Sequence, residues 1–312
     1  MNEIKVKKEV EIFGVDAGKA NLVVYNGKDI FTCPSTFAKG VDKLEDGYQV
    51  LHKGAKYLIG DRTLPYDLEL TKEKERHKIL LYFGIAQLVK QNAHCSVVTS
   101  CPVDIFSKKA LRKSYIEFLT PNTQDGRVEI TVGLTTKVFY IDEITVIPEG
   151  VGVVYNQTEL FNDELVGLID IGGATTNCLL FDDTSFIRDK SFTETNGMHY
   201  LTMKIRDSLK KEGLIVSDLE VKYYIKDPGD YKFLIDSIIN SYVDEIYDYT
   251  IARNWGDKRK ILFSGGGSVT LEEKLKLKFR DSTFSTDALY DNCKGNYQFG
   301  VMLCRSKEEQ KQ

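Results

Sequence analysis

The stretch that most constrains the fold runs from residue 166 to residue 182, VGLIDIGGATTNCLLFD. It predicts a buried strand, an aspartate at the strand's end, a glycine turn with hydroxyl side chains, and a returning strand. Glycines let a backbone pass close to a charged ligand, and such a turn points several N–H groups at one place. The turn therefore suits a phosphate. Asp170 beside it suits a hydrated Mg²⁺, because Mg²⁺ keeps its waters and is held by one or two carboxylates and by phosphate oxygens.

The same pattern occurs 154 residues earlier, in FGVDAGKANLVVY at 13–25. A strand ends at Asp16, a short turn carries Gly18 and Lys19, and a second strand follows. Neither copy is a dinucleotide fingerprint, because a helix follows the turn in that motif. Two strand–Asp–Gly–strand units predict two related domains that face one another.

A third segment, KILFSGGGSVTLEEKL at 260–275, predicts a strand, three glycines and a helix. Thr270 and Glu273 fit a capping box, which would start the helix after the glycines. Glycines carry no side chain, so a glycine run at this point leaves room for a flat group or a phosphate beside the backbone. The alternative is a flexible loop.

Periodicity predicts the elements between these motifs. Apolar residues at 71–91 predict an amphipathic helix with one apolar face, and the runs at 128–140 and 144–147 predict separate strands. Helices are predicted at 197–211, with Leu201, Ile205 and Leu209 as the apolar stripe, and at 232–254. The apolar stripe, with the flanking strands, predicts sheets covered by helices.

Taken in this order, the three motifs resemble those of the actin, sugar kinase and Hsp70 ATPase superfamily. Residues 16–19 look like its first phosphate motif, residues 170–176 like its second, and residues 264–268 like its adenosine motif. Residues 147–155, IPEGVGVVY, resemble its first connecting motif, whose polar residue positions the attacking water.

Within that superfamily the chain is most similar to the plasmid-segregating bacterial actins of the ParM type. The similarity rests on residues 97–106, on the pair Pro148-Glu149 and on residues 296–302, NYQFGVM. The sequence departs from the family pattern at Tyr297, where proline is usual, and at Lys19 within a short Ala-Gly-Lys turn.

The resemblance implies an α/β protein with the actin-like fold: two related domains, each with a mixed five-stranded sheet flanked by helices, and a nucleotide cleft between them. The first domain spans 1–155, with a small outer subdomain at about 38–65, and is rejoined by a C-terminal helix at about 290–312. The second domain spans 156–289 and holds the second phosphate hairpin, the adenosine motif and a reduced second subdomain.

The resemblance also implies ATP or GTP and Mg²⁺ as cofactors. Asp16 and Asp170 would share the water shell of the metal, and Glu149 would orient or deprotonate the attacking water. The alternative for Glu149 is an exposed glutamate at a helix start. Lys19 would neutralise the β-phosphate or point to solvent. The hydroxyls of Thr175 and Thr176 would bond phosphate oxygens, the alternative being that they are ordinary threonines at a strand start. The residues expected to bind the nucleotide are Ala17, Gly18, Lys19, Gly172, Gly173, Ala174, Thr175, Gly265, Gly266 and Gly267.

Composition restricts the partners. The net charge of −4 gives no general attraction to DNA or to acidic membranes, so contact with DNA is expected to run through a partner. The six cysteines have no metal-ligand spacing and the four histidines are dispersed, which favours a reducing cytoplasm. No signal-peptide core and no apolar run of membrane-spanning length is present, so no membrane contact is expected.

The leading hypothesis is a filament-forming ATPase or GTPase of the bacterial actin kind. Its expected partners are copies of itself, stacked head to tail, and a DNA-bound adaptor in plasmid segregation. One alternative is a small-molecule kinase, for which Asp104 is the only candidate base. A second is a membrane-linked cell-division or shape actin, disfavoured because neither terminus predicts an amphipathic helix. A third is a nucleotide switch that does not hydrolyse.

Overall fold

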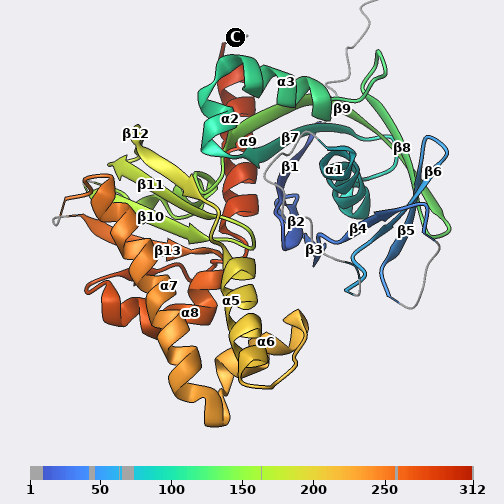
Figure 1. Cartoon of the computed structure of the whole chain (residues 1–312). Helices are drawn as coiled ribbons and strands as arrows, with labels where there is room; N and C mark the ends of the chain where they lie inside the picture. The colour runs from blue at the N-terminus through green and yellow to red at the C-terminus, as the bar shows by residue number, and fades with distance from the viewer. Residues whose placement is uncertain are drawn as a thin grey trace, which may run out of the picture. The chain divides into compact units, whose positions relative to one another are not determined.

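The computed structural model describes residues 10–41, 46–62, 64, 74–162, 164–256 and 259–310. The chain divides into two compact units (Figure 1). Unit 1 comprises Met1–Gln157 with Asn292–Gln312, and unit 2 comprises Thr158–Asp291. Parts of the outer subdomain expected at 38–65 and of the helix expected at 71–91 lie outside the described residues.

Unit 1 is built on a mixed sheet with the strand order β3-β2-β1-β7-β9-β8-β5-β6-β4. The strands are β1 (Val10–Ala17), β2 (Asn21–Tyr25), β3 (Ile30–Pro34), β4 (Phe37–Lys39), β5 (Tyr48–His52), β6 (Ala55–Ile59), β7 (His94–Cys101), β8 (Arg127–Val132) and β9 (Thr135–Pro148). The helices are α1 (Glu75–Leu88), α2 (Val103–Ser107), α3 (Lys109–Leu119), α4 (Gly152–Asn156) and α9 (Asp291–Glu309).

Unit 2 contains a sheet with the order β12-β11-β10-β13-β14. Its strands are β10 (Leu165–Ile171), β11 (Thr176–Asp182), β12 (Ser185–Glu194), β13 (Lys260–Ser264) and β14 (Thr283–Phe284). Its helices are α5 (Met198–Lys211), α6 (Asp218–Lys226), α7 (Lys232–Ala252) and α8 (Gly265–Lys278), with short 3₁₀ turns at Thr158–Leu160 and Gly229–Tyr231.

The two sheets share one topology over five strands. In unit 1, β1 is antiparallel to β2 and parallel to β7, β2 is antiparallel to β3, and β7 is parallel to β9. In unit 2, β10, β11, β12, β13 and β14 repeat this arrangement strand for strand. The mixed five-stranded sheet expected in each domain is therefore present in both units. In unit 1 four further strands, β8, β5, β6 and β4, extend it.

Helix α1 is enclosed by the extended sheet of unit 1. It packs against β1, β2, β3 and β8, and Figure 1 shows it within the curve of these strands. Its buried residues run without a break from Ile79 to Ala86. The prediction of a helix with a single apolar face is therefore wrong, because a helix surrounded by a curled sheet meets apolar side chains on nearly every side.

The strands at the two ends of the sheet order, β3 and β4, are separated in sequence by only Ser35 and Thr36, both fully buried. Arg76 of α1, 6% exposed, donates from Nε and Nη2 to the carbonyl oxygen of Ser35, at 3.1 and 2.6 Å. A buried guanidinium needs such acceptors. Arg76 therefore ties the enclosed helix to the β3–β4 connection.

Two strand predictions in unit 1 need correction. The run predicted as one strand at 128–140 contains two strands, β8 and β9, because Gly133 adopts a φ of 60° and turns the chain. The strand predicted at 144–147 is the end of β9, which spans 14 residues. An alternating pattern gives the period of a strand but does not say where a long strand bends or reverses.

The core of unit 2 lies between its sheet and three helices. Leu201, Ile205 and Leu209 of α5 are buried, as their spacing predicts. They pack in one cluster with residues of α7, α8 and the alternate strand residues Ile169 and Ile171.

Within the described part of the chain, no helix combines the length and apolar character needed to cross a membrane.

Candidate functional site

The first candidate turn follows β1. Asp16 is the next-to-last residue of that strand, is partly exposed, and pairs with Val23 of β2. Ala17 ends the strand and is buried. Lys19 is only 7% exposed, so the expectation that it could point to solvent is wrong. Gly18 is placed so tightly that an added Cβ would lie 3.0 Å from the carbonyl oxygen of Asn21.

The second candidate turn follows β10. Asp170 is again the next-to-last residue of the strand, is 5% exposed, and lies between Asn177 of β11 and Ser264 of β13. The N–H of Gly172 donates to the carbonyl oxygen of Thr175 at 2.9 Å, which closes the turn. The Gly172 N–H is thus used within the protein, although it was expected to meet phosphate.

The carbonyl groups of this second turn are held by the start of α5. The N–H groups of Gly197, Met198 and His199 donate to the carbonyl oxygens of Ala174, Gly172 and Gly173, at 3.1, 2.9 and 2.8 Å. These bonds use donors that a helix start otherwise leaves unpaired. They also fix the turn.

With the carbonyls fixed in this way, three donors of the turn remain available. Within the residues that the structure describes, no hydrogen bond uses the backbone N–H of Gly173, Ala174 or Thr175. Successive N–H groups of this kind can form an anion-binding concavity. Thr175 is partly exposed, whereas Thr176 is fully buried and its hydroxyl donates to the carbonyl of Asn196 at 3.3 Å. The expectation that the Thr176 hydroxyl bonds a ligand is therefore wrong.

Gly197 is a residue of this turn region that sequence reasoning missed. An added Cβ would lie 2.5 Å from the Thr175 nitrogen and 2.6 Å from the Gly173 oxygen, so no other residue fits without a shift. The available signal was a glycine placed directly before the first turn of an amphipathic helix. That signal is weak without knowledge of what packs there.

The three-glycine segment differs from its prediction. Helix α8 begins at Gly265, with Ser264 as N-cap residue, so the glycines form its first turn and no capping box exists at Thr270 and Glu273. Instead, the Thr270 hydroxyl donates to the carbonyl oxygen of Gly266 at 3.1 Å. A capping box in the described chain lies at Ser217 and Glu220, where α6 begins.

Two of the three glycines are required for packing. Gly265 has a φ of 82°, and an added Cβ would lie 2.3 Å from Oδ1 of Asp170. A Cβ on Gly267 would lie 2.2 Å from the side chain of Ile171. Of the three, only Gly266 is exposed. Gly265 therefore makes room for the Asp170 carboxylate, and Gly266 is the glycine whose backbone is accessible.

Glu149 lies at the carboxyl end of β9. Its N–H donates to the carbonyl oxygen of Cys101, the last residue of the neighbouring parallel strand β7, at 2.8 Å. The residue is partly exposed and precedes α4, which begins at Gly152, so it is not a helix-start glutamate. Because β1, β7 and β9 are parallel, their carboxyl ends share one edge of the sheet. Asp16 and Glu149 are thus two strand spacings apart at this edge, roughly 10 Å.

The residues are therefore brought together in two groups, one in each unit. In unit 1, Asp16, the Gly18 turn and Glu149 share an edge. In unit 2, Asp170, the turn at 172–175 and Gly265 lie together. Among the described residues, no three His, Cys, Asp or Glu side chains gather as they would in an all-protein metal cage. Asp16 and Asp170 each offer carboxylate oxygens, the ligand type that Mg²⁺ prefers.

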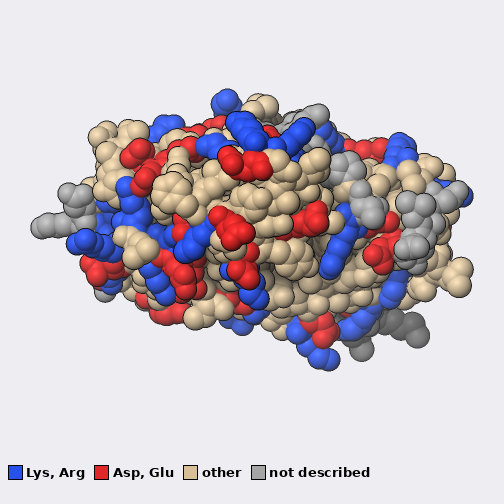
Figure 2. Space-filling model, turned by 60° about the horizontal axis from the view of Figure 1, so that its bottom comes forward, with Lys and Arg blue, Asp and Glu red and all other residues tan. Residues whose placement is uncertain are grey.

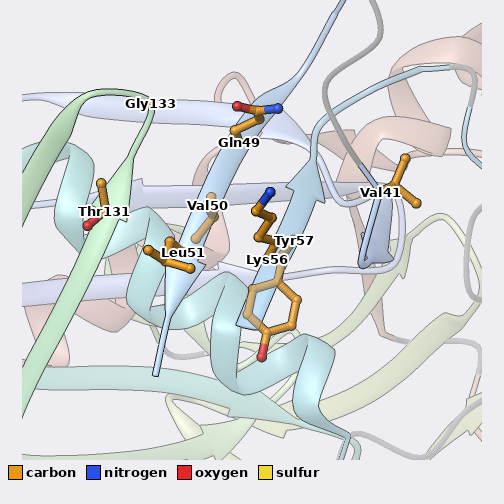
Figure 3. Close-up of a pocket in the computed structure, with 8 residues that line it drawn as sticks. All are labelled: Val41, Gln49, Val50, Leu51, Lys56, Tyr57, Thr131 and Gly133. Atoms are coloured by element: carbon orange, nitrogen blue, oxygen red, sulfur yellow. The ribbon is translucent and has the colours of Figure 1, made fainter. Parts of the chain in front are cut away.

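One pocket of the described structure lies elsewhere in unit 1, on β5, β6 and β8 (Figure 3). It is lined by Val41, Gln49, Val50, Leu51, Lys56, Tyr57, Thr131 and Gly133. It contains none of the candidate phosphate, metal or water-orienting residues.

The charged side chains show no gathering by sign on the face drawn in Figure 2, where acidic and basic residues are interspersed. Among the described residues, acidic and basic side chains also form ion pairs, such as Lys204 with Glu245 at 2.8 Å and Lys278 with Asp244 at 2.6 Å. Asp104, the candidate base for a kinase, is exposed in the first turn of α2.

Comparison with known proteins supports the description of the fold. The family model for the N-terminal domain of actin-like proteins matches residues 14–152. That segment contains the first turn and Glu149. None of the curated proteins matches the chain in sequence.

Solved structures match over nearly the whole chain. An archaeal actin homologue superposes with a TM-score of 0.78 at 16% identity, covering 94% of this chain and 100% of that one. A non-polymerisable quadruple mutant of pCBH ParM gives 0.77 at 18% identity, covering 94% and 100%. A 15-stranded ParM filament from Clostridium botulinum gives 0.75 at 17% identity, covering 94% and 99%. The archaeal protein has also been solved in complex with ADP. At these identities the likeness concerns the fold.

Proposed function

We propose that this chain, which has the actin-like fold and whose residues 14–152 match the family model for the N-terminal domain of actin-like proteins, is a nucleotide-dependent, filament-forming ATPase or GTPase. In this proposal the two units are the two domains of an actin-like subunit, and each glycine turn supplies donors to the nucleotide.

The observation that carries the proposal is the repeated turn. In both units an aspartate is the next-to-last residue of the same strand of the shared five-strand topology, and a glycine turn follows it. A β-hairpin needs neither the aspartate nor the unused N–H groups of the second turn. Phosphate binding uses both.

The chain's own donors define what each turn does. The N–H groups of Gly173, Ala174 and Thr175 bind the phosphate oxygens in unit 2, and the backbone of Ala17, Gly18 and Lys19 does so in unit 1. The buried ammonium of Lys19 neutralises part of the phosphate charge. Gly266, the accessible glycine of α8, is where the adenosine or guanosine lies against the backbone. Gly265 and Gly267 hold α8 in place.

Asp16 and Asp170 are proposed to hold Mg²⁺ through its waters. When bound, the ion would neutralise charge that would otherwise make the phosphates and the two carboxylates repel one another. The structure offers a reason why Asp170 suits this task. Its carboxylate occupies the space left by the missing Cβ of Gly265, and is therefore fixed at the end of β10.

Glu149 is proposed to orient the attacking water and to accept its proton. Its backbone is fixed by the bond to Cys101 while its side chain stays partly exposed, so the carboxylate can reach a ligand at the strand edge. The exposed position of Asp104 in α2 gives it no comparable surroundings. This favours hydrolysis over transfer to a small molecule.

The proposed partners follow from the same premise. Copies of the chain stack head to tail, since a heterologous contact that does not close produces a filament. We further propose plasmid segregation, with a DNA-bound adaptor that captures filament ends, in a reducing cytoplasm that keeps all six cysteines as free thiols. The solved ParM filament supports self-association by analogy of fold.

Sedimentation with ATP, GTP, ADP or no nucleotide, in Mg²⁺, tests the filament proposal. We expect the protein to pellet with one triphosphate and to stay in the supernatant without nucleotide. Protein that stays in the supernatant under every condition, across micromolar concentrations, contradicts the filament proposal. The small-molecule kinase and the non-hydrolysing nucleotide switch would then be the remaining hypotheses.

Substitution of Glu149→Gln tests hydrolysis. Loss of the proton acceptor is expected to lower kcat by a factor of about 10² or more, while nucleotide-dependent pelleting persists. The matched control is Glu143→Gln on the same strand, whose carboxylate pairs with Lys307. Equal phosphate release from the Glu149 variant and wild type would show that Glu149 has no part in hydrolysis.

A further inference from the structure

Asn296 of α9 is a buried polar residue that the sequence motifs did not single out as a site residue. It is fully buried, and its Nδ2 donates to the carbonyl oxygen of Val15 at 3.0 Å and to Oγ of Ser100 at 3.1 Å. Oγ of Ser100 also lies 3.3 Å from Oδ1 of Asn296. The amide therefore joins three elements of unit 1: α9, β1 and β7.

These contacts lie where the β1–β7 ladder stops. The parallel register of β1 and β7 ends at Val15 and Thr99, whereas β7 continues to pair with β9 as far as Cys101 and Pro148. Val15 is also paired with Val24 of β2, and the β1–β2 ladder continues to Ala17. The Asn296 amide adds a side-chain hydrogen bond to the Val15 carbonyl and, through Ser100, links β1 to β7 just where their ladder ends.

The residues directly beyond these contacts are the two candidate carboxylates of unit 1. Asp16 follows Val15 in the chain. Cys101 follows Ser100, and its carbonyl accepts the N–H of Glu149 at 2.8 Å. Asn296 thus links the residue before Asp16 to Ser100 by hydrogen bonds. The residue after Ser100, Cys101, holds the backbone of Glu149 by another.

The close approach of α9 to β1 allows a side chain as short as asparagine to reach. A Cβ on Gly14 would lie 2.0 Å from the Cys293 oxygen and 2.5 Å from the Tyr297 nitrogen. Helix and strand backbones are therefore in contact there. An apolar side chain of similar size would fill the same space but would lose the hydrogen bonds that link Val15 to Ser100.

We propose that Asn296 is a positioning residue, which fixes the carboxylate of Asp16 relative to Glu149 and thereby sets the Mg²⁺ dependence of nucleotide binding and hydrolysis. The inference rests on the proposed function. Asn296 itself touches neither nucleotide nor metal; it acts through the carbonyl of Val15.

The test compares Asn296→Leu with a control in the same unit, Leu119→Val in α3, whose buried side chain is apolar and takes no part in these hydrogen bonds. Nucleotide binding is measured by calorimetry with Mg²⁺ and with EDTA, and turnover is measured as a function of Mg²⁺. For Asn296→Leu we expect the Mg²⁺-dependent gain in affinity and the turnover to fall about tenfold, the effect of losing a buried side-chain hydrogen bond. Binding in EDTA is expected to stay within about twofold of wild type.

Ser100→Ala is the second variant, because Asn296→Leu could fail to fold. It keeps the bond to Val15 and removes only one partner of the amide, so we expect the same changes at about threefold. If both variants match Leu119→Val in every measurement, Asn296 is structural only and the inference is wrong. A wild-type protein that neither binds nor hydrolyses a triphosphate contradicts the proposed function instead, and is recognised before any variant is made.

Discussion

The two units share a five-strand topology and an aspartate at the same strand position, yet they differ in what is inserted between the third and fourth strands along the chain. In unit 1 the insertion between β3 and β7 contains β4, β5, β6 and α1. In unit 2 the insertion between β12 and β13 contains α5, α6 and α7. One insertion extends the sheet and the other covers it.

This difference changes what holds each glycine turn. In unit 2 the start of α5 donates three backbone N–H groups to the turn at 172–175. In unit 1 the N–H of Ser35, in the β3–β4 connection, donates to the carbonyl oxygen of Ala20 at 2.9 Å. The same local motif is thus stabilised by a helix in one unit and by a strand connection in the other. Equivalent substitutions should therefore have unequal effects.

The largest expected effect is a difference in lost stability between a substitution in one insertion and a substitution in the other. Phe83 of α1 is fully buried inside the curled sheet, whereas Tyr223 of α6 is 63% exposed. Phe83→Ala should lower the free energy of unfolding by about 3–5 kcal/mol through loss of buried apolar contacts. Tyr223→Ala should change it by less than about 0.5 kcal/mol. Denaturant unfolding measures both, and similar losses would mean that the α6 insertion is packed in solution.

The next effect is a difference in lost stability between glycine substitutions at the two turns. Gly197→Ala should cost about 2–3 kcal/mol, because the new Cβ would push α5 away from Thr175 and Gly173. Gly18→Ala should cost about 1 kcal/mol or less, since φ is negative there and only the Asn21 carbonyl must shift. Thermal unfolding measures the difference. If the two variants lose equal stability, α5 does not hold its turn more firmly than Ser35 holds the other.

The smallest effect concerns one histidine with a lowered pKa in each unit, His52 and His199. Burial lowers the pKa of His52, whose Nδ1 lies 2.7 Å from the carbonyl oxygen of Glu129, and burial likewise lowers the pKa of His199. The unfolded chain therefore binds more protons between the lowered pKa and the ordinary value near 6.5. The stability from each neutral histidine is present above that ordinary value and is lost as the pH falls.

We expect His52→Gln and His199→Gln each to flatten the fall in unfolding free energy between pH 7 and pH 5. One proton contributes at most about 1.4 kcal/mol per pH unit. Urea unfolding at several pH values measures the slope. A slope unchanged in either variant would contradict the assigned pKa direction for that histidine.

Several features of the fold could be predicted from residue patterns. The repeated strand–Asp–Gly–strand motif predicted the hairpins β1–β2 and β10–β11, and the spacing of Leu201, Ile205 and Leu209 predicted the buried face of α5. The actin-like fold that the family resemblance implied is confirmed. The hairpins and the buried face of α5 could be predicted because each depends on a short segment and its own periodicity.

Other features required knowledge of what lies beside each segment. Thr270 and Glu273 have the spacing of a capping box, but the first turn of α8 forms earlier, where Gly265 fits around the Asp170 carboxylate. From the sequence alone, Asn296 cannot be distinguished from other polar residues of a helix, because its partner, the carbonyl oxygen of Val15, is distant in the chain. The roles of the candidate site residues stay predictions.

The sequence by itself determined where two aspartates end two strands and where glycines free the backbone beside them, because chain connectivity and backbone sterics act over a few residues. Only the tertiary structure decided which of those N–H groups remain available, which glycines serve packing, and that Asn296 reaches the edge carrying Asp16. Those outcomes depend on atoms that are distant in sequence, and a hydrogen bond or a steric contact is made only after the chain has brought them together.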